Sequence, residues 1–166
     1  MNLLIRKMTL EDIPAVIQLD HVSFSLPWPE RSFRFEVTDN PTSRCWVAEI
    51  DRRIAGMVVA WLFVNEVHIA TIATHPDFRR LGIGSRILSH TLLQALEEGA
   101  RSSFLEVRES NLAAQELYRK FGYEEAGRRR RYYRDNDEDA ILMSLEPLNR
   151  DHLIRDDDPA AGKEQV

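Results

Sequence analysis

The segment from Thr74 to Ser85 constrains this chain more than any other part of the sequence. It reads Thr-His-Pro-Asp-Phe-Arg-Arg-Leu-Gly-Ile-Gly-Ser. The apolar, β-branched run Val67–Ala73 precedes it and an amphipathic helical pattern follows it, so the predicted order is strand, glycine-containing turn and helix. Free N–H groups and the positive end of the helix dipole make such a turn an anion-binding site. Arg79 and Arg80 add fixed positive charge, and phosphate is therefore the expected ligand.

Known phosphate motifs limit the interpretation of this turn. No Gly-Lys-Ser/Thr closes it as in a Walker loop, and it lacks the three glycines of the dinucleotide fingerprint. An ordinary strand-to-helix turn with solvated arginines would give the same pattern. The spacing Arg79-x-x-Gly82-x-Gly84 resembles the pyrophosphate loop of the GCN5-related N-acetyltransferases (GNAT superfamily), which hold acetyl-coenzyme A. The resemblance implies a binding site for acetyl-coenzyme A formed by Ile72, Ala73, Thr74, Arg79, Arg80, Leu81, Gly82, Ile83, Gly84 and Ser85.

Length and composition are typical of a soluble globular protein. The 166 residues suit one compact domain, and no apolar run is long enough to cross a bilayer. No secretory leader is apparent, so we expect a cytoplasmic protein without a membrane partner. The single cysteine, Cys45, excludes an internal disulfide and is interpreted as a buried structural thiol. The net charge of −5 argues against direct nucleic-acid binding, and the five histidines show no metal-ligand spacing.

Hydrophobic periodicity predicts the element order β-αα-βββ-α-β-α-ββ, an α/β fold with a mixed seven-stranded sheet and helices on both faces. Strands are expected over residues 3–6, 44–50, 54–64, 67–74, 103–107, 123–133 and 140–146. Helices are expected over residues 13–22, 30–38 and 83–98, and from Ser110 or Asn111 to Gly122. Residues 1–148 form the predicted acetyltransferase domain. From Asn149 onward the composition turns charged and small, so we interpret residues 149–166 as a disordered tail.

The resemblance to the GNAT fold covers essentially all of residues 1–148. In that fold the fourth and fifth strands, here 67–74 and 103–107, run parallel but splay apart, and the pantetheine arm pairs with the fourth strand. An open wedge leaves backbone groups unpaired, and a bound amide chain satisfies them. Four further segments resemble the RimI-type branch, the ribosomal-protein N-terminal alanine acetyltransferases: Phe24–Pro29, Leu105–Asn111, Leu117–Tyr123, and Arg131–Tyr133 with Glu138–Met143.

The resemblance implies a reaction and its catalytic residues. A protein's N-terminal α-amine, that of the N-terminal alanine of a small-subunit ribosomal protein, attacks the acetyl thioester. At neutral pH most of an α-amine, with pKa about 7.7–8.0, is protonated, so a base must take a proton. The resemblance gives that role to Glu106 and makes Tyr118 the acid that protonates the departing thiolate. Alternatively, Glu106 pairs with Arg108 or Lys120, and Tyr118 belongs to the apolar core.

The same resemblance places the cofactor and acceptor contacts. A backbone N–H near residues 72–74 would stabilise the oxyanion. Asn111 would hydrogen-bond the cofactor, although it could also cap its helix. The acceptor peptide would enter between the Phe24–Pro29 loop and the final hairpin. Candidate substrate-binding residues are Trp28, Tyr132 and Tyr133.

Several charged or aromatic features of the last hairpin have alternative explanations. Tyr132 and Tyr133 could pack across the sheet instead of holding substrate. The acidic loop 135–139 could attract a basic substrate tail or be a solvated turn. Arg128–Arg131 cannot form one RNA-binding patch, because alternate residues of a strand face opposite ways. We interpret these arginines as solvated charge.

Two other functions remain open from the sequence. The acceptor could be a lysine side chain, a polyamine or another small amine. A lysine ε-amine has a pKa of about 10.4, which makes proton removal harder than from an α-amine. The chain could also be a non-catalytic acyl-coenzyme A-binding module. Such a module would be marked by loss of the acid and the base, and both residue types are present here.

Overall fold

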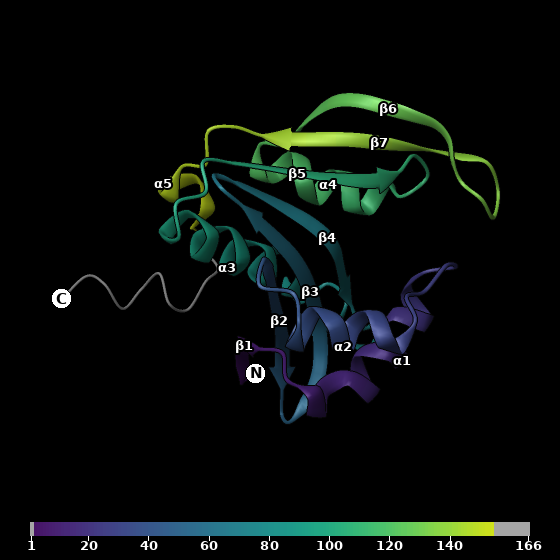
Figure 1. The fold of residues 1–166 in the computed structure, drawn as a ribbon, viewed down its shortest axis with the longest axis vertical. Helices are drawn as coiled ribbons and strands as arrows, with labels where there is room; N and C mark the ends of the chain where they lie inside the picture. The colour runs from purple at the N-terminus through teal and green to yellow at the C-terminus, as the bar shows by residue number, and fades with distance from the viewer. Residues whose placement is uncertain (1, 155–166) are drawn as a thin grey trace.

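The protein is described here by a computed structural model over residues 2–154, and its elements follow the predicted order (Figure 1). The strands are β1 (Leu3–Lys7), β2 (Ser43–Ile50), β3 (Arg53–Phe63), β4 (Glu66–Thr74), β5 (Ser102–Arg108), β6 (Glu124–Tyr133) and β7 (Glu138–Leu145). The helices are α1 (Ile13–Ser23), α2 (Glu30–Thr38), α3 (Ile83–Glu97), α4 (Leu112–Phe121) and α5 (Arg150–Leu153). Short 3₁₀ turns, η1 (Leu10–Asp12) and η2 (Pro76–Phe78), precede α1 and α3. The α/β fold predicted from the sequence is confirmed.

The strands form one seven-stranded mixed sheet in the order β1-β2-β3-β4-β5-β7-β6. Within the described residues, β4 and β5 are parallel and the other neighbouring strands are antiparallel. The parallel pairing ends at Ile69 and Leu105, although β4 continues to Thr74 and β5 to Arg108. The register of β4 against β3 also shifts at this level, between Val59 and Ala60. The two central strands therefore separate halfway along, as the sequence predicts.

Helices cover both faces of the sheet, and each face has its own core. On one face α1 and α2 pack through residues such as Val16 and Phe33 against Val47, Met57 and Val59 of the sheet. On the other face α3, α4 and α5 pack on a larger cluster that includes the intervening strand residues Ala48, Val58 and Ala60. Alternate strand residues enter opposite cores, as the two-residue period of a strand requires. The central strands are buried on both faces, which explains why they read as nearly continuous apolar runs.

Helix α3 shows how sequence spacing produces one of these contacts. Ile83, Ile87, Leu88, Leu92 and Ala95 recur at helical spacing and are all buried. Fully burying each of the larger side chains contributes about 1.5–3 kcal/mol. The packing fixes α3 against β2, β3 and β4. Its N-terminus consequently lies beside the end of β4, which is where the anion site is predicted.

The start of the predicted tail is wrong in one respect. Residues Arg150–Leu153 form α5, and the Asn149 side chain caps it by accepting a hydrogen bond from the backbone N–H of Asp151. Leu153 is buried in the core with Leu148, and Ser89 Oγ donates to the Leu153 carbonyl. An isolated leucine anchors this segment although its neighbours are charged, so the packed part of the chain extends to Leu153. The predicted tail from residue 155 onward lies outside the described residues.

Cys45 lies on β2, partly buried, with its Sγ 3.1 Å from Ser43 Oγ. Burial raises the pKa of this thiol to about 11, so it stays protonated near neutral pH and fits a structural role. None of the helices in residues 2–154 is long and apolar enough to cross a membrane.

Candidate functional site

The turn between β4 and α3 has the features of an anion-binding site. Gly82 caps α3 in the left-handed conformation, φ 74°, and provides no side-chain hydrogen bond to the first turn of the helix. The N–H groups of that turn therefore face outward without a capping oxygen. Arg80 also adopts a positive φ, 65°, a strained conformation for a residue with a Cβ. Among the described residues, neither Arg79 nor Arg80 has an ion-pair partner, so their charge is available to a ligand.

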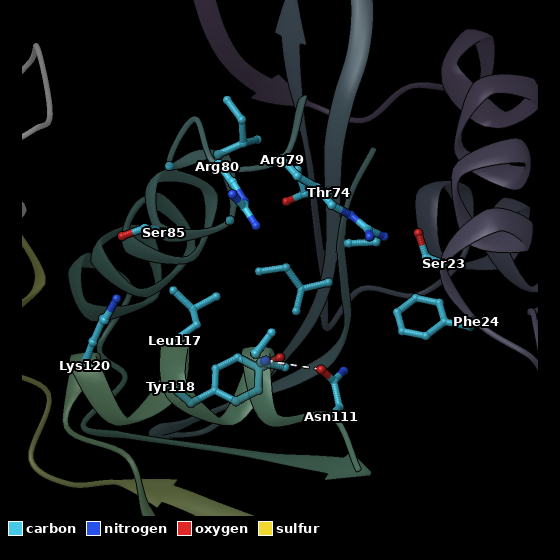
Figure 2. A pocket seen from close by; sticks show the side chains of 17 residues that line it. Ser23, Phe24, Thr74, Arg79, Arg80, Ser85, Asn111, Leu117, Tyr118 and Lys120 are labelled. Carbon is cyan, nitrogen blue, oxygen red and sulfur yellow. Dashed lines mark hydrogen bonds between the residues drawn. The ribbon is translucent and has the colours of Figure 1, made fainter. Parts of the chain in front are cut away.

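This turn borders a cavity of about 940 Å³ between β4, α3 and α4. Figure 2 shows Thr74, Arg79 and Arg80 at one end, Tyr118 and Asn111 at the other, and Phe24 beside them. Of the residues predicted to bind the cofactor, Ile72, Ala73, Thr74, Arg79, Arg80, Gly82, Ile83, Gly84, Ser85 and Asn111 line it. Leu81 does not line this cavity and is 47% exposed, because the left-handed residues on either side turn it outward.

Gly84, the second glycine of the motif, lies between β4 and α4. A Cβ on Gly84 would lie 3.4 Å from Thr74 Oγ1 and 3.5 Å from Leu117 Cδ2. These are ordinary van der Waals distances, so the space between the two elements would also admit a methyl group. The arginines, which are unpaired within the described residues, and the uncapped helix N-terminus at this end of the cavity suit an anionic group of a ligand.

A second cavity, of about 290 Å³, lies on the α1–α2 side of the splayed strands. It shares five lining residues with the larger cavity, so the two meet where β4 and β5 separate: Phe24, Ile72, Asn111, Ala114 and Tyr118. The smaller cavity is also lined by Glu106, Trp28 and Tyr133. The predicted base and acid therefore lie in the same cavity.

Glu106 is on β5, one residue past the last β4–β5 pair, with its side chain 24% exposed. Its Oε1 lies 3.4 Å from Nε of Arg129 on β6. The sequence alternative that paired Glu106 with Arg108 or Lys120 is wrong about the partner. Arg108 pairs with Asp135 and Glu138 instead, and Lys120 with Glu116.

Tyr118 lies on α4 and is only 6% exposed. Its ring packs 5.8 Å from that of Tyr123, so the apolar-core alternative describes its ring correctly. Tyr118 nevertheless lines both cavities. Burial, together with the nearby Tyr133, raises the pKa of the Tyr118 phenol well above its ordinary value. The phenol therefore stays protonated throughout the physiological range and can donate a hydrogen bond or a proton.

Asn111 caps α4 and also lies where it could contact a cofactor. Its side-chain oxygen accepts a hydrogen bond from the backbone N–H of Ala114 at 3.2 Å, which caps α4. It also lines both cavities. The cap orients the side chain at the junction and leaves its amide nitrogen free to act as a donor there.

Of the three predicted substrate-binding residues, Trp28 and Tyr133 line the smaller cavity and Tyr132 does not. Trp28 lines the smaller cavity and packs 5.3 Å from Phe33. Tyr133 also lines it, beneath the guanidinium of Arg108 at 3.9 Å from the ring centre. Tyr132 does not line either cavity and is 45% exposed. Adjacent strand residues point to opposite sides, so only one of the two tyrosines can face the cavity.

Several exposed charges in the last hairpin form ion pairs. Arg128 contacts Glu109, Glu125 and Asp139 at 2.9–3.4 Å, and Arg129 contacts Glu106. In the acidic loop, Asp135 and Glu138 pair with Arg108. Arg128 and Arg129 are therefore exposed side chains that also form ion pairs, so the interpretation as solvated charge leaves out these partners.

Sequence reasoning missed two charged residues that line the smaller cavity, Asp20 and Arg108. Asp20 is 1% exposed on α1; its Oδ2 accepts the Trp28 backbone N–H at 2.7 Å, while Oδ1 is buried without a partner. Desolvation raises the pKa of this carboxyl. An aspartate on the core-facing side of α1, next to Leu19, was the available signal. Within the described residues, His, Cys, Asp and Glu form no cluster suited to a metal ion.

Comparison with known proteins identifies the family. A model of the acetyltransferase (GNAT) family matches residues 13–123, which contain the β4–α3 turn and both cavity-lining helices. The chain belongs to the acetyltransferase (GNAT) family. The separation of β4 and β5 agrees with this family assignment. The resemblance to the GNAT fold predicts such an opening as the place where the cofactor enters.

Several bacterial relatives are named for the same activity. The chain is 39% identical over 139 residues to a putative [ribosomal protein bS18]-alanine N-acetyltransferase of Bacillus subtilis, covering 84% of this chain and 92% of the relative. It is 31% identical over 152 residues to the [ribosomal protein bS18]-alanine N-acetyltransferase of Escherichia coli, covering 85% and 95%. The solved structure of the ribosomal-protein-S18-alanine N-acetyltransferase from E. coli matches with a TM-score of 0.82 at 29% identity, covering 89% and 96%.

A more distant structure shares the GNAT fold. Arabidopsis thaliana NAA60 in complex with acetyl-CoA has a TM-score of 0.80 at 16% identity, with coverage of 87% of this chain and 98% of that one. This similarity concerns the fold alone.

Proposed function

We propose that this protein transfers the acetyl group of acetyl-coenzyme A to the N-terminal α-amine of a protein, the N-terminal alanine of ribosomal protein bS18. One structural observation carries the proposal. A long cavity beginning at an uncapped helix N-terminus and a short cavity containing a carboxylate meet at Tyr118. The names of the similar bacterial enzymes support the choice of acceptor.

The larger cavity would hold the acetyl donor. The first turn of α3 and the side chains of Arg79 and Arg80 would bind the diphosphate. The backbone of β4 beyond Ile69 has no β5 partner, so its polar groups near Ile72–Thr74 can pair with the amides of the pantetheine arm. The thioester then supplies an activated acetyl group at the junction of the two cavities.

The smaller cavity would hold the acceptor amine, with Glu106 as its base. As the amine nitrogen attacks the carbonyl carbon, its proton passes to the Glu106 carboxylate, directly or through water. The carbon–sulfur bond then breaks and a thiolate departs. Tyr118, which lines both cavities and is held in its protonated form, would lie near that thiolate. Its raised pKa makes complete proton transfer to sulfur costly, so a hydrogen bond that stabilises the thiolate is its main contribution.

Mass spectrometry of defined peptides tests this function. The full-length chain is incubated with acetyl-coenzyme A and either a free peptide beginning with alanine or the same peptide blocked at its N-terminus and containing a lysine. We expect one added acetyl group on the α-amine of the free peptide only. Acetylation of the blocked peptide, or of a polyamine in preference to both, would assign the enzyme to a different acceptor class. Coenzyme binding without acetylation of any amine would favour the non-catalytic alternative.

A further inference from the structure

Arg108 connects the two loops that flank the smaller cavity. It lies at the end of β5, two residues after Glu106 and therefore on the same face of the strand. One loop, between α1 and α2, contains Ser25; the other, between β6 and β7, contains Asp135 and Asn136. In Figure 1 these two loops approach each other at the same end of the molecule, beyond the C-terminal end of β5.

The contacts of Arg108 reach both loops at once. Its Nη1 lies 3.0 Å from Asp135 Oδ1 and 3.4 Å from both Asn136 Oδ1 and Glu138 Oε2. Its Nη2 donates to Ser25 Oγ at 3.3 Å. Ser25 Oγ in turn donates to Asp135 Oδ2 at 2.5 Å. The planar guanidinium suits such divergent contacts, because its donors are fixed in one fork.

The same side chain shapes the cavity wall. The Arg108 guanidinium stacks over Tyr133, 3.9 Å from the ring centre, and both residues line the smaller cavity. Its side chain is 20% exposed, and its carboxylate partners Asp135 and Glu138 are 24% and 11% exposed. Glu138 also accepts a hydrogen bond from the backbone N–H of Ser110, which ties the hairpin to the start of α4. Of these contacts, the one between Arg108 and Glu138 is partly buried and those with Asp135 and Ser25 are exposed, so the link between the loops depends on several contacts acting together.

We propose that Arg108 clamps the α1–α2 loop to the β6–β7 hairpin and thereby holds the acceptor peptide's amine in position beside Glu106. Arg108 is a positioning residue in this scheme and takes no part in proton transfer. The inference rests on the proposed function for its acceptor. It also accounts for the acidic loop, whose Asp135 and Glu138 are occupied by Arg108 rather than available to a basic substrate tail.

Steady-state kinetics with the alanine peptide test the clamp. We expect Arg108→Met to raise the peptide KM about tenfold while kcat and the coenzyme A Kd stay within about twofold of wild type. Arg108→Lys keeps the charge but not the fork, so its KM should lie between those of wild type and Arg108→Met. Ser25→Ala removes the contacts of Ser25 Oγ with Asp135 and with Arg108 but keeps the Arg108 contacts to the hairpin, so it should raise KM about threefold with the fold intact.

Arg128→Gln is the matched control. Arg128 lies on the same hairpin and has three carboxylate partners, but it does not line either cavity. It should lower hairpin stability without changing the peptide KM. An equal rise in KM for Arg128→Gln and Arg108→Met would overturn the proposal, as would an unchanged KM in Arg108→Met.

Hydrogen exchange separates failure of the clamp from failure of the proposed function. In Arg108→Met, amides of both the 24–29 and the 134–138 segments should exchange faster than in wild type, whereas in Arg128→Gln the 24–29 segment should not change. This result needs no acceptor, so it would stand even if wild-type protein acetylated no N-terminal peptide. Unchanged exchange of the 24–29 segment in Arg108→Met would contradict the clamp whatever the acceptor.

Discussion

The two cavities that meet at Tyr118 differ in how many of their charged side chains have partners. The larger one begins at the glycine-containing turn and the uncapped N-terminus of α3, and its two arginines have no ion-pair partner among the described residues. The charged side chains that line the smaller one already have partners: Glu106 contacts Arg129, Arg108 contacts Asp135 and Glu138, and one oxygen of Asp20 accepts the Trp28 N–H. A ligand of fixed chemistry can be met by a rigid local turn. An acceptor that must be selected needs side chains assembled from several segments.

If the larger cavity holds the acetyl donor and the smaller one the acceptor amine, loss of the base should affect catalysis and leave coenzyme A binding unchanged. We expect Glu106→Gln to lower kcat by about 10³-fold, within the range attributed to general base catalysis, while the coenzyme A Kd is unchanged. Glu109→Gln is the control, because Glu109 lies just beyond β5 and its side chain contacts only Arg128. Calorimetric titration of coenzyme A and initial rates measure the two quantities. Full activity in Glu106→Gln would remove Glu106 from the mechanism.

Tyr118 belongs to both cavities, so its variant tests whether they work together. Tyr118→Phe should lower kcat by about 30-fold, because a hydrogen bond to the thiolate is lost while the ring packing is kept. The raised pKa of Tyr118 also means that its ionisation should not reduce activity below about pH 10. Rates of wild type and Tyr118→Phe between pH 6 and about pH 10 check both points. An alkaline decline that disappears in the variant would contradict the assigned protonation state.

Charge removal at the turn should affect only the donor. Arg79→Gln and Arg80→Gln should each raise the KM for acetyl-coenzyme A about tenfold, since each removes a charge-assisted contact to the diphosphate. The peptide KM and the melting temperature should stay near wild type, because neither arginine is paired within the described residues. Arg53→Gln, which breaks an exposed pair with Asp77 outside the cavity, is the control. A larger change in the KM for the peptide than in the KM for acetyl-coenzyme A would contradict the assignment of the larger cavity to the donor.

The last expected effects concern the stability contributions of two aspartates, Asp12 at the start of α1 and Asp20 within it. Asp12 receives two 2.8 Å hydrogen bonds from Arg6, which lower its pKa below the ordinary 3.8. Its stabilisation is present above pH 3.8 and is lost as pH falls through the lowered value, so Asp12→Asn should cost about 2 kcal/mol at neutral pH and less in acid.

Asp20 should behave in the opposite sense. Burial raises its pKa, so the folded state binds its proton more tightly and stability falls as pH rises from 3.8 through the raised value. Asp20→Asn keeps an oxygen for the Trp28 N–H and avoids that ionisation, so its stability relative to wild type should increase with pH. Urea unfolding of both variants from pH 3 to about pH 7 measures the trends. Parallel trends for the two variants would contradict this interpretation.

Local features of this chain were predictable because they depend on neighbours in sequence. The β4–turn–α3 order follows from period, glycine placement and the basic pair, and the splayed strands and the GNAT family follow from the motif resemblance. Leu81 shows the limit of that reasoning. It lies inside the motif, yet the positive φ of Arg80 and Gly82 turns it away from the cavity.

Contacts between distant segments were not predictable in the same way. Glu106 pairs with Arg129 because β7 returns between β5 and β6, and the register places Leu142 beside both Glu106 and Gly127. The register shift between Arg129 and Tyr133 then decides which tyrosine faces the cavity. Neither the insertion of β7 nor the shift leaves a periodic signal in the sequence.

The sequence by itself determined the order of elements, the glycine-containing basic turn and the residue types available for acid–base chemistry, because these follow from backbone propensity and side-chain period over a few residues. Only the tertiary structure decided which charges neutralise one another, which aromatic side chains enter the smaller cavity and that Arg108 joins its two loops. Those outcomes depend on strand order and register, since electrostatic partners are chosen by distance in space.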